Sequence, residues 1–209
     1  MDKYLETFET WNKIAKLYQD KFMDLDLYND SYDKFCELLQ KRNPSILEIG
    51  CGPGNITKYL LDKRPDFEIL ATDISPNMIE LAKTNCPGAK FEVIDSRAIE
   101  NINNKFDAIV CGFCLPYLSE LDVEKLIVDC KNLLNENGKI YLSFVEGERD
   151  QSGYQKGSSG DRTYFYYHNF ENLTERLKRN NFENQFLIRK SYEKNDKTEE
   201  IHTIVIAEK

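Results

Sequence analysis

The glycine-rich segment from Glu48 to Gly54 constrains this 209-residue chain more than any other feature. It reads Glu-Ile-Gly-Cys-Gly-Pro-Gly and overlaps the end of Ser45–Ile49, a short apolar run that predicts a strand. Glycines at the end of a strand let the backbone turn sharply and let a ligand approach the main chain. A helix is expected after Gly54, and its N-terminus offers free N–H groups and a partial positive charge. The segment therefore predicts a ligand-binding turn.

An acidic residue at the end of the next predicted strand narrows the class of ligand that the turn could bind. Asp73 follows Gly54 by 19 residues, and a carboxylate there suits a ribose diol because it accepts two hydrogen bonds. A dinucleotide fingerprint would place its third glycine at position 55, where this chain has Asn55. Glu48 would also repel a pyrophosphate and favour a positively charged ligand. These residues favour a cationic nucleoside and disfavour a nicotinamide cofactor.

The rest of the chain alternates strands and helices. Further strands are expected at Phe67–Thr72, Phe91–Ile94, Phe106–Cys111 and Lys139–Val145, with helices after Gly54, after Ser75-Pro76, and from Val123 to a stop at Asn137-Gly138. A helix at Glu171–Arg179 then precedes Gln185–Lys190 and Ile201–Ala207, which Asn195-Asp196-Lys197 would join as a hairpin. This order predicts an α/β, Rossmann-like fold: a seven-stranded, mostly parallel sheet with helices on both faces and an antiparallel C-terminal hairpin.

The N-terminal region predicts helices that lie outside this sheet. Aromatic and apolar residues from Tyr4 to Phe22 recur at spacings of three and four, which is one face of a helix. A second helix around Phe35 would end at Asn43-Pro44. We expect a single domain in which residues 1–43 form a helical lid on a core of residues 44–209. The polar stretch within residues 146–168 is expected to be a substrate-side loop.

From about Ile46 onward the sequence resembles the class I S-adenosylmethionine-dependent methyltransferases, of the type that acts on small molecules. The resemblance rests on the glycine loop, on Asp73 with the residues through Met78, on Asp95 closing the third strand, on Phe106–Val110 and on Leu133–Phe144. It implies S-adenosylmethionine as cofactor and S-adenosylhomocysteine as product. The cofactor-binding residues that it implies are Tyr18, Glu48, Gly50, Cys51, Gly52, Asp73, Ile74, Met78, Asp95, Ser96, Arg97, Cys111 and Gly112.

The resemblance also implies roles within this set. Gly50 and Gly52 would line the methionine part and Asp73 would hold the ribose. Asp95, with Ser96 or Arg97, would flank the adenine, on which Met78 would pack. Cys111 and Gly112 would lie beneath the sulfonium. The segment Trp11–Tyr18 is similar to a lid helix whose tyrosine touches the cofactor, so Tyr18 and Trp11 are candidate contacts.

The segment after the fourth strand limits the methyl acceptor. Cys111–Tyr117 lacks the Asp/Asn-Pro-Pro-aromatic motif of enzymes that methylate amide or exocyclic nitrogens, and the chain has no Pro-Cys nucleophile. A net charge of −8 disfavours nucleic acid as partner. A small molecule with an O, N or C nucleophile is therefore expected, and the substrate-side candidates are Tyr117, Tyr166 and His168. His168 is the candidate general base, with a purely structural helix-terminus role as its alternative.

Composition bounds the remaining possibilities. No uncharged apolar stretch approaches the roughly 20 residues needed to span a bilayer, and the first residues lack a signal-peptide core. Cys111-Gly-Phe-Cys114 has no second cysteine pair at zinc-ligand spacing, so we expect buried thiols and no metal. A reduced cytoplasmic enzyme is predicted. A nucleoside-binding regulatory module of the same fold, without turnover, is the alternative, and the acceptor and oligomeric state stay open.

Overall fold

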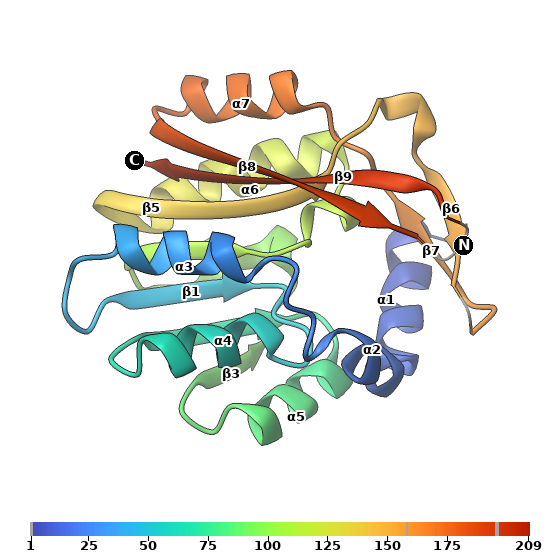
Figure 1. The fold of residues 1–209 in the computed structure, drawn as a ribbon, viewed down its shortest axis with the longest axis horizontal. Coiled ribbons are helices and arrows are strands. Elements are labelled where there is room, and N and C mark those ends of the chain that lie inside the picture. The colour runs from blue at the N-terminus through green and yellow to red at the C-terminus, as the bar shows by residue number, and fades with distance from the viewer. Residues whose placement is uncertain (1, 158, 195–196) are drawn as a thin grey trace.

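A seven-stranded sheet forms the centre of the molecule, as a computed structural model of residues 2–157, 159–194 and 197–209 describes it (Figure 1). The strands are β1 (Ser45–Ile49), β2 (Glu68–Asp73), β3 (Lys90–Val93), β4 (Phe106–Cys111), β5 (Leu134–Val145), β8 (Glu183–Glu193) and β9 (Glu199–Glu208). Their order is β3-β2-β1-β4-β5-β9-β8; the first five are parallel, and β9 and β8 run antiparallel to their neighbours. The predicted fold class is confirmed.

Helices cover both faces of this sheet. The helices are α1 (Lys3–Lys13), α2 (Ala15–Phe22), α3 (Asn29–Leu38), α4 (Asn55–Lys63), α5 (Pro76–Asn85), α6 (Glu120–Leu133) and α7 (Phe170–Arg179). Helices α3, α4 and α5 lie on one face, α6 and α7 lie on the other, and α1 and α2 lie at the carboxyl ends of the parallel strands (Figure 1). Ser75 caps α5 and Asn169 caps α7 through their side chains.

Alternating strand residues fill two separate cores. Ile46 of β1 packs with Tyr32 and Phe35 of α3, whereas its neighbour Leu47 packs with Leu126 and other α6 residues. This follows from the two-residue period of a strand, which directs consecutive side chains to opposite faces. The chain order reverses between β1 and β4, and ligands of open α/β sheets bind at the carboxyl ends of the strands at such a switch point.

The N-terminal region is two helices, so the expectation of one helix from Tyr4 to Phe22 is wrong. The break lies at Ile14, whose φ of −97° and ψ of 16° depart from helical values. The helix around Phe35 ends at Leu38, earlier than Asn43-Pro44. The two aromatic segments therefore turn relative to each other, and the rings of Trp11 and Tyr18 meet edge to face at 5.4 Å.

The segment between β5 and α7 also differs from a simple loop. It contains a hairpin of β6 (Gly153–Lys156) and β7 (Arg162–Phe165), which packs beside α1.

At the other end of β5, helix α6 ends at Leu133, before the predicted stop at Asn137-Gly138. The strand begins at once, and Asn137 takes a φ of 59° within it. The predicted turn at Asn195-Asp196 lies outside the described residues.

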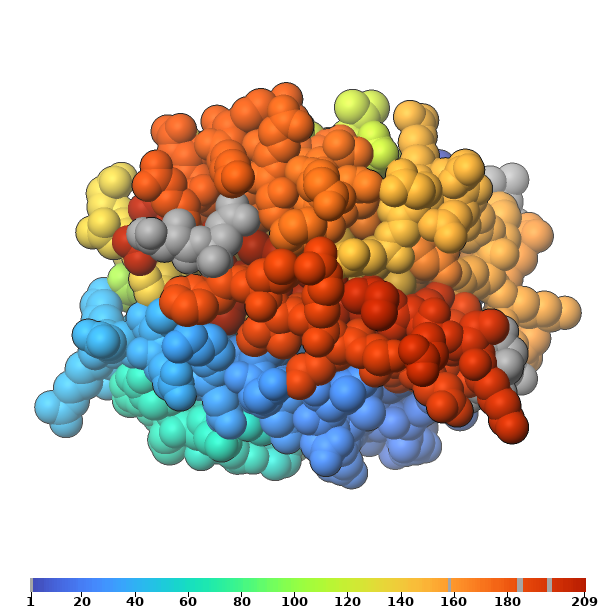
Figure 2. Space-filling view, turned by 45° about the horizontal axis from the view of Figure 1, so that its top comes forward, coloured from blue at the N-terminus to red at the C-terminus, as the bar shows by residue number. Residues whose placement is uncertain are grey.

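The C-terminal hairpin lies against the N-terminal helices. Figure 2 shows β8, in orange-red, running across the surface beside α3, in blue. Lys190 of β8 forms an ion pair of 2.5 Å with Asp30 of α3, and the Lys34 ammonium lies 4.9 Å from the ring centre of Phe186. This contact brings the chain just before α3 next to β9.

Across the described ranges, no helix is both long enough and apolar enough to cross a membrane.

Candidate functional site

The turn after β1 requires its glycines. Gly50, Gly52 and Gly54 have φ values of +70°, +54° and +88°, in the left-handed region that L side chains rarely adopt. The N–H groups of Gly50 and Cys51 both donate to the Thr72 carbonyl, at 2.8 and 2.9 Å, which ties the turn to β2. A Cβ atom at Gly50 would lie only 3.0 Å from Cys114 Cβ. The turn therefore runs close under the segment that follows β4.

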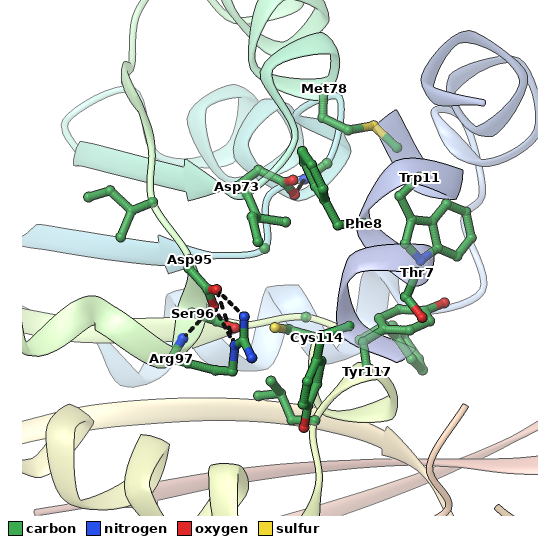
Figure 3. A pocket seen from close by; sticks show the side chains of 18 of the residues that line it. Thr7, Phe8, Trp11, Asp73, Met78, Asp95, Ser96, Arg97, Cys114 and Tyr117 are labelled. Carbon is green, nitrogen blue, oxygen red and sulfur yellow. Dashed lines mark hydrogen bonds and ion pairs between the residues drawn. The ribbon is translucent and has the colours of Figure 1, made fainter. Parts of the chain in front are cut away.

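Asp73 ends β2 beside this turn. Its Oδ2 accepts a hydrogen bond from the Gly52 N–H at 2.9 Å, and its Oδ1 accepts one from the Ser75 N–H at 2.8 Å. Burial raises the pKa of the Asp73 carboxyl, while these two hydrogen bonds oppose the rise. The carboxylate is thus fixed in direction and lines a cavity above the strand ends (Figure 3).

This first cavity is lined from six separate segments of the chain. Asp95, Ser96 and Arg97 line it on one side, and Asp95 pairs with Arg97 at 2.5 Å (Figure 3). The lining residues are Tyr4, Thr7, Phe8, Trp11, Tyr18, Gly50, Gly52, Asp73, Ile74, Met78, Ile94, Asp95, Ser96, Arg97, Gly112, Phe113, Cys114, Tyr117 and Leu118. Carboxylates, a sulfur side chain and aromatic rings thus surround one space, which suits a ligand with both polar and flat apolar parts.

Helix α1 lines this cavity and is held by β7 and by the start of α6. Thr10 Oγ1 donates to the Arg162 carbonyl at 2.9 Å, and the Tyr164 N–H donates to Thr7 Oγ1 at 2.9 Å, which joins α1 to β7. The Tyr4 hydroxyl donates to Asp122 and accepts from the Ser119 N–H, which joins α1 to the start of α6. The outer wall of the cavity is therefore a helix attached by side chains rather than by the central sheet.

A second cavity opens beside the first, with a volume of about 620 Å³. Both cavities are lined by Trp11, Tyr18, Gly50, Gly52, Gly112, Phe113 and Tyr117. The residues that line only the second include Tyr28, Phe165, Tyr192, Glu200 and His202. The volume lies within the range of small-molecule pockets. The two spaces meet over the glycine turn and Gly112, so ligands in them would touch there.

Three observations test whether a sulfonium nucleoside fits. Gly50 and Gly112 leave no space for added Cβ atoms: one at Gly50 would lie 3.0 Å from Cys114 Cβ, and one at Gly112 would lie 2.2 Å from Ile56 Cδ1. Trp11 Nε1 is buried and has no hydrogen-bond partner among the described residues. The Asp73 carboxylate and the Asp95–Arg97 pair line the same cavity. The residues present therefore fit an adenosine with a short charged tail.

The structure brings most of the predicted cofactor residues together. Tyr18, Gly50, Gly52, Asp73, Ile74, Met78, Asp95, Ser96, Arg97 and Gly112 line the first cavity, and Cys51 lines the second. Trp11 and Tyr117 line both. Glu48 and Cys111 are fully buried behind the cavity walls and line neither. These two residues support the turn and β4 rather than face a ligand.

The expected negative charge at Glu48 is wrong for neutral pH. Burial raises the pKa of this carboxyl to about 8, although the Thr57 hydroxyl donates to Oε2 at 2.6 Å and opposes the rise. The carboxyl is therefore mostly protonated at neutral pH. The repulsion of a pyrophosphate that the sequence suggested cannot come from this residue there.

His168 and Tyr166, two predicted substrate residues, do not line either cavity. His168 is 6% exposed, its Nε2 lies 2.8 Å from the Leu115 carbonyl and its N–H donates to the Val145 carbonyl. Burial lowers the pKa of His168. The structure thus corresponds to the structural alternative, in which His168 connects β5 to the turn after β4.

Sequence reasoning missed the polar residues of the second cavity. His202 and Glu200 lie on β9, and neither is among the residues that the sequence predicted for the site. Tyr28 precedes α3, and Tyr192 lies near the end of β8. A signal was present, because His202 and Thr203 are polar residues within an apolar run, but only the hairpin register shows which neighbours His202 meets.

Residues 46–138 match the profile of the methyltransferase domain family. A putative methyltransferase of Invertebrate iridescent virus 6 is 30% identical over 139 residues, 66% of this chain and 49% of that protein. Malonyl-[acyl-carrier protein] O-methyltransferase of Acetivibrio thermocellus is 30% identical over 131 residues, 61% of this chain and 42% of that protein. The chain thus spans about half the length of these relatives.

Solved structures share the fold. Magnesium protoporphyrin IX methyltransferase of Synechocystis PCC 6803, with bound S-adenosylhomocysteine, has a TM-score of 0.72 at 16% identity and covers 100% of both chains. A methyltransferase of Methanosarcina mazei has a TM-score of 0.70 at 19% identity, covering 84% of this chain and 96% of that one. The family profile over residues 46–138, the relatives and the sheet order together show that this chain is similar to the class I S-adenosylmethionine-dependent methyltransferases.

Proposed function

We propose that this protein transfers a methyl group from S-adenosylmethionine to a small molecule. The observation that carries the proposal is that two cavities meet over the glycine turn and Gly112. The first has the polar and apolar groups that suit the nucleoside, and the second has room for a separate acceptor. Such an arrangement lets one molecule meet the other end to end, as in-line displacement requires.

The chain's own residues would hold the donor in the first cavity. Asp73 would accept hydrogen bonds from the ribose, Met78 would pack on the adenine, and the glycine turn would admit the methionine part. When bound, S-adenosylmethionine supplies an electrophilic methyl group on a sulfonium. The protein's task is then to align the acceptor and exclude water, and such positioning can contribute about 7–11 kcal/mol to lowering a barrier. Helix α1 and the β6–β7 hairpin would act as the lid that excludes water.

The acceptor side favours a small molecule over a polymer. Tyr117, Phe165 and Tyr192 give the second cavity aromatic walls, and residues of α1 and α2 also line it. The net charge of −8 is unfavourable for nucleic acid. A solved structure of the same fold contains a small molecule. It is 1,6-didemethyltoxoflavin-N1-methyltransferase from Burkholderia thailandensis with bound 1,6-didemethyltoxoflavin; its TM-score is 0.69 at 16% identity, covering 99% of this chain and 87% of that one.

The six unpaired cysteines favour a reducing compartment, so we place the enzyme in the cytoplasm.

Calorimetric titration with S-adenosylhomocysteine, S-adenosylmethionine and NAD tests the proposal. We expect both sulfur nucleosides to bind and NAD not to bind. Asp73→Ala should weaken binding about 100-fold, or roughly 2.7 kcal/mol, because it removes a charged hydrogen-bond acceptor. Asp62→Ala, which changes an exposed α4 carboxylate paired with Lys58, is the matched control and should bind as the wild type does. Preference for NAD, or equal binding by Asp73→Ala, would refute the assignment.

The alternative function, a regulatory module that binds the nucleoside without turnover, predicts the same binding. It differs in that no S-adenosylhomocysteine should form from S-adenosylmethionine with any acceptor. A panel of phenols, amines and carboxylic acids, with product measured by mass spectrometry, separates the two. The open second cavity favours the enzyme, because a purely regulatory nucleoside site would not need it.

A further inference from the structure

His202 is a buried histidine on the wall of the second cavity with one ring nitrogen unused. The residue is 7% exposed, and its Nδ1 lies 2.6 Å from the Tyr28 hydroxyl oxygen. Its Nε2 is buried and has no hydrogen-bond partner among the described residues; the nearest carboxylate oxygen, Glu200 Oε2, lies 3.7 Å away. A buried nitrogen without a partner is unfavourable in an empty site. It indicates a position that a ligand atom completes.

Aromatic rings hold the imidazole in one plane. The ring of Tyr192 stacks on His202 at 4.7 Å and 12°, and the ring of Tyr28 lies on it at 5.9 Å and 16°. Phe113 contacts the same imidazole at 5.0 Å. A ring fixed in this way directs its Nε2 to one point. Flat walls of this kind suit a flat conjugated ligand, because aromatic rings pack best face to face with an offset or edge to face.

The charges around this cavity favour a ligand that carries an anionic oxygen. Glu200 is already compensated: it accepts from Lys194 at 3.0 Å and from the Tyr167 hydroxyl at 2.7 Å. His202, Tyr167 and Lys194 together lower the pKa of Glu200 to about 2. Lys21 and Lys156 also line the cavity, and neither forms an ion pair with any carboxylate in the part of the chain that the structure describes. The lining therefore holds an excess of positive charge.

We propose, resting on the function proposed above, that the second cavity binds a flat conjugated acceptor with an acidic ring hydroxyl and that His202 is the catalytic base for that hydroxyl. The acceptor O–H bond breaks and its proton goes to Nε2. The oxygen electron pair forms the new O–CH₃ bond while the methyl–sulfur bond breaks and leaves its electron pair on sulfur. The proton on His202 then passes to water. Nδ1–H donates to the Tyr28 oxygen throughout, and Glu200 faces the resulting imidazolium.

The probe for this proposal is 7-hydroxycoumarin, because its phenol and phenolate forms absorb at different wavelengths. Its ionisation is measured against pH in the presence of saturating S-adenosylhomocysteine, with the bound probe separated from the free. The titratable and charged groups around His202 are Tyr28 and Asp30 near the start of α3, Lys190, Tyr192 and Lys194 on and after β8, and Glu200 on β9. Each is left unchanged in the variants.

We expect the bound probe to be at least tenfold more ionised at a given pH than the free probe. His202→Asn and His202→Gln should remove this difference while S-adenosylhomocysteine still binds, which also verifies that each variant folds. His168→Gln changes the other histidine, which lines neither cavity, and should behave as the wild type. 7-Methoxycoumarin, which has no hydroxyl proton, should bind equally to the wild type and to His202→Asn.

Three results would overturn the proposal. They are unchanged ionisation on binding to the wild type, an equal shift in both His202 variants, and no binding of the probe to a protein that does bind S-adenosylhomocysteine. Failure of S-adenosylhomocysteine itself to bind is a different result, because it refutes the function proposed above. The nucleoside titration therefore precedes the probe titration.

Discussion

Glu48 shows how a single residue can have a role different from its sequence signature. The acidic residue before the glycines suggests a negative charge, yet its side chain is 1% exposed and Oε1 has no hydrogen-bond partner among the described residues. The ordinary value for a glutamate is 4.5, and burial raises its pKa here to about 8. The residue therefore acts as a neutral hydrogen-bonding group beneath the turn across most of the physiological range.

This burial predicts a pH-dependent stability. Between pH 4.5 and about 8 the folded protein holds a proton on Glu48 that the unfolded chain has released, so stability falls as pH rises through this range. The loss is at most about 5 kcal/mol, from 1.36 kcal/mol per pKa unit. In Glu48→Gln the free energy of unfolding should not fall through this range for this reason. The variant should therefore be more stable, relative to the wild type, at pH 8.5 than at pH 5. Urea unfolding at both values measures it.

Glu68→Gln is the control, because Glu68 is an exposed carboxyl at the start of β2. It should follow the wild-type pH dependence. If Glu48→Gln also follows it, with parallel curves at both pH values, then Glu48 ionises in the folded protein as an exposed glutamate does, and our account of the turn is wrong.

At the scale of elements, the positions of the central strands largely followed from the sequence, whereas the β6–β7 hairpin and the helix attachments did not. β1 and β4 have the bounds that their apolar runs predict, and the Ser75-Pro76 signal marks the start of α5. The turn glycines and Asp73 were predictable because their spacing reflects backbone geometry. The break at Ile14 was not, because no glycine or proline marks it and the β6–β7 hairpin that holds α1 lies about 150 residues away.

Tyr4 joins helix α1 to the start of α6. The Tyr4 hydroxyl accepts from the Ser119 N–H at 2.9 Å and donates to Asp122, and the Arg97 guanidinium lies 4.2 Å from the centre of its ring. We predict that Tyr4→Phe weakens S-adenosylhomocysteine binding about five- to tenfold, or roughly 1–1.4 kcal/mol, because the lid opens more readily. Calorimetry measures the affinity, and hydrogen exchange of α1 amides measures the opening.

Tyr59→Phe is the matched variant, since the Tyr59 hydroxyl donates to Asp33 at 2.9 Å between α4 and α3, and neither residue lines a cavity. It should leave nucleoside binding and α1 exchange unchanged. Faster exchange of α1 in Tyr4→Phe without any loss of affinity would show that the helix does not act as a lid.

At the scale of the molecule, the candidate site joins parts of the chain that only the tertiary fold brings together. The first cavity was largely predictable, because its residues follow parallel strands whose carboxyl ends share one edge. The second was not: Tyr28 meets His202 only because α3 lies against the C-terminal hairpin, and a contact across 174 residues leaves no local pattern. His168 was chosen for its residue type and for its position between the polar stretch and a predicted helix, and its surroundings proved to be structural.

The division between lid and core gives the last prediction. Residues 1–43 contain two different kinds of helix. α1 contributes only Thr7 and Thr10 as buried residues, whereas α3 contributes Tyr32 and Phe35, which are 5% and 1% exposed and pack against the central strands. We propose that α1 and α2 form the lid and that α3 belongs to the core. Loss of a buried aromatic side chain alone costs about 3–5 kcal/mol, so a core that lacks α3 should not be stable.

Two truncations separate these roles. Removal of residues 1–13 should leave a cooperative thermal transition within a few degrees of the wild type but reduce S-adenosylhomocysteine affinity at least tenfold, because α1 walls the first cavity without supporting the sheet. Removal of residues 1–43 should abolish the cooperative transition, since it uncovers the β1 and β5 side chains beneath α3. Circular dichroism melts and calorimetry measure both. Unfolding of the shorter truncation, or a stable fold of the longer one, would reverse the assignment of lid and core.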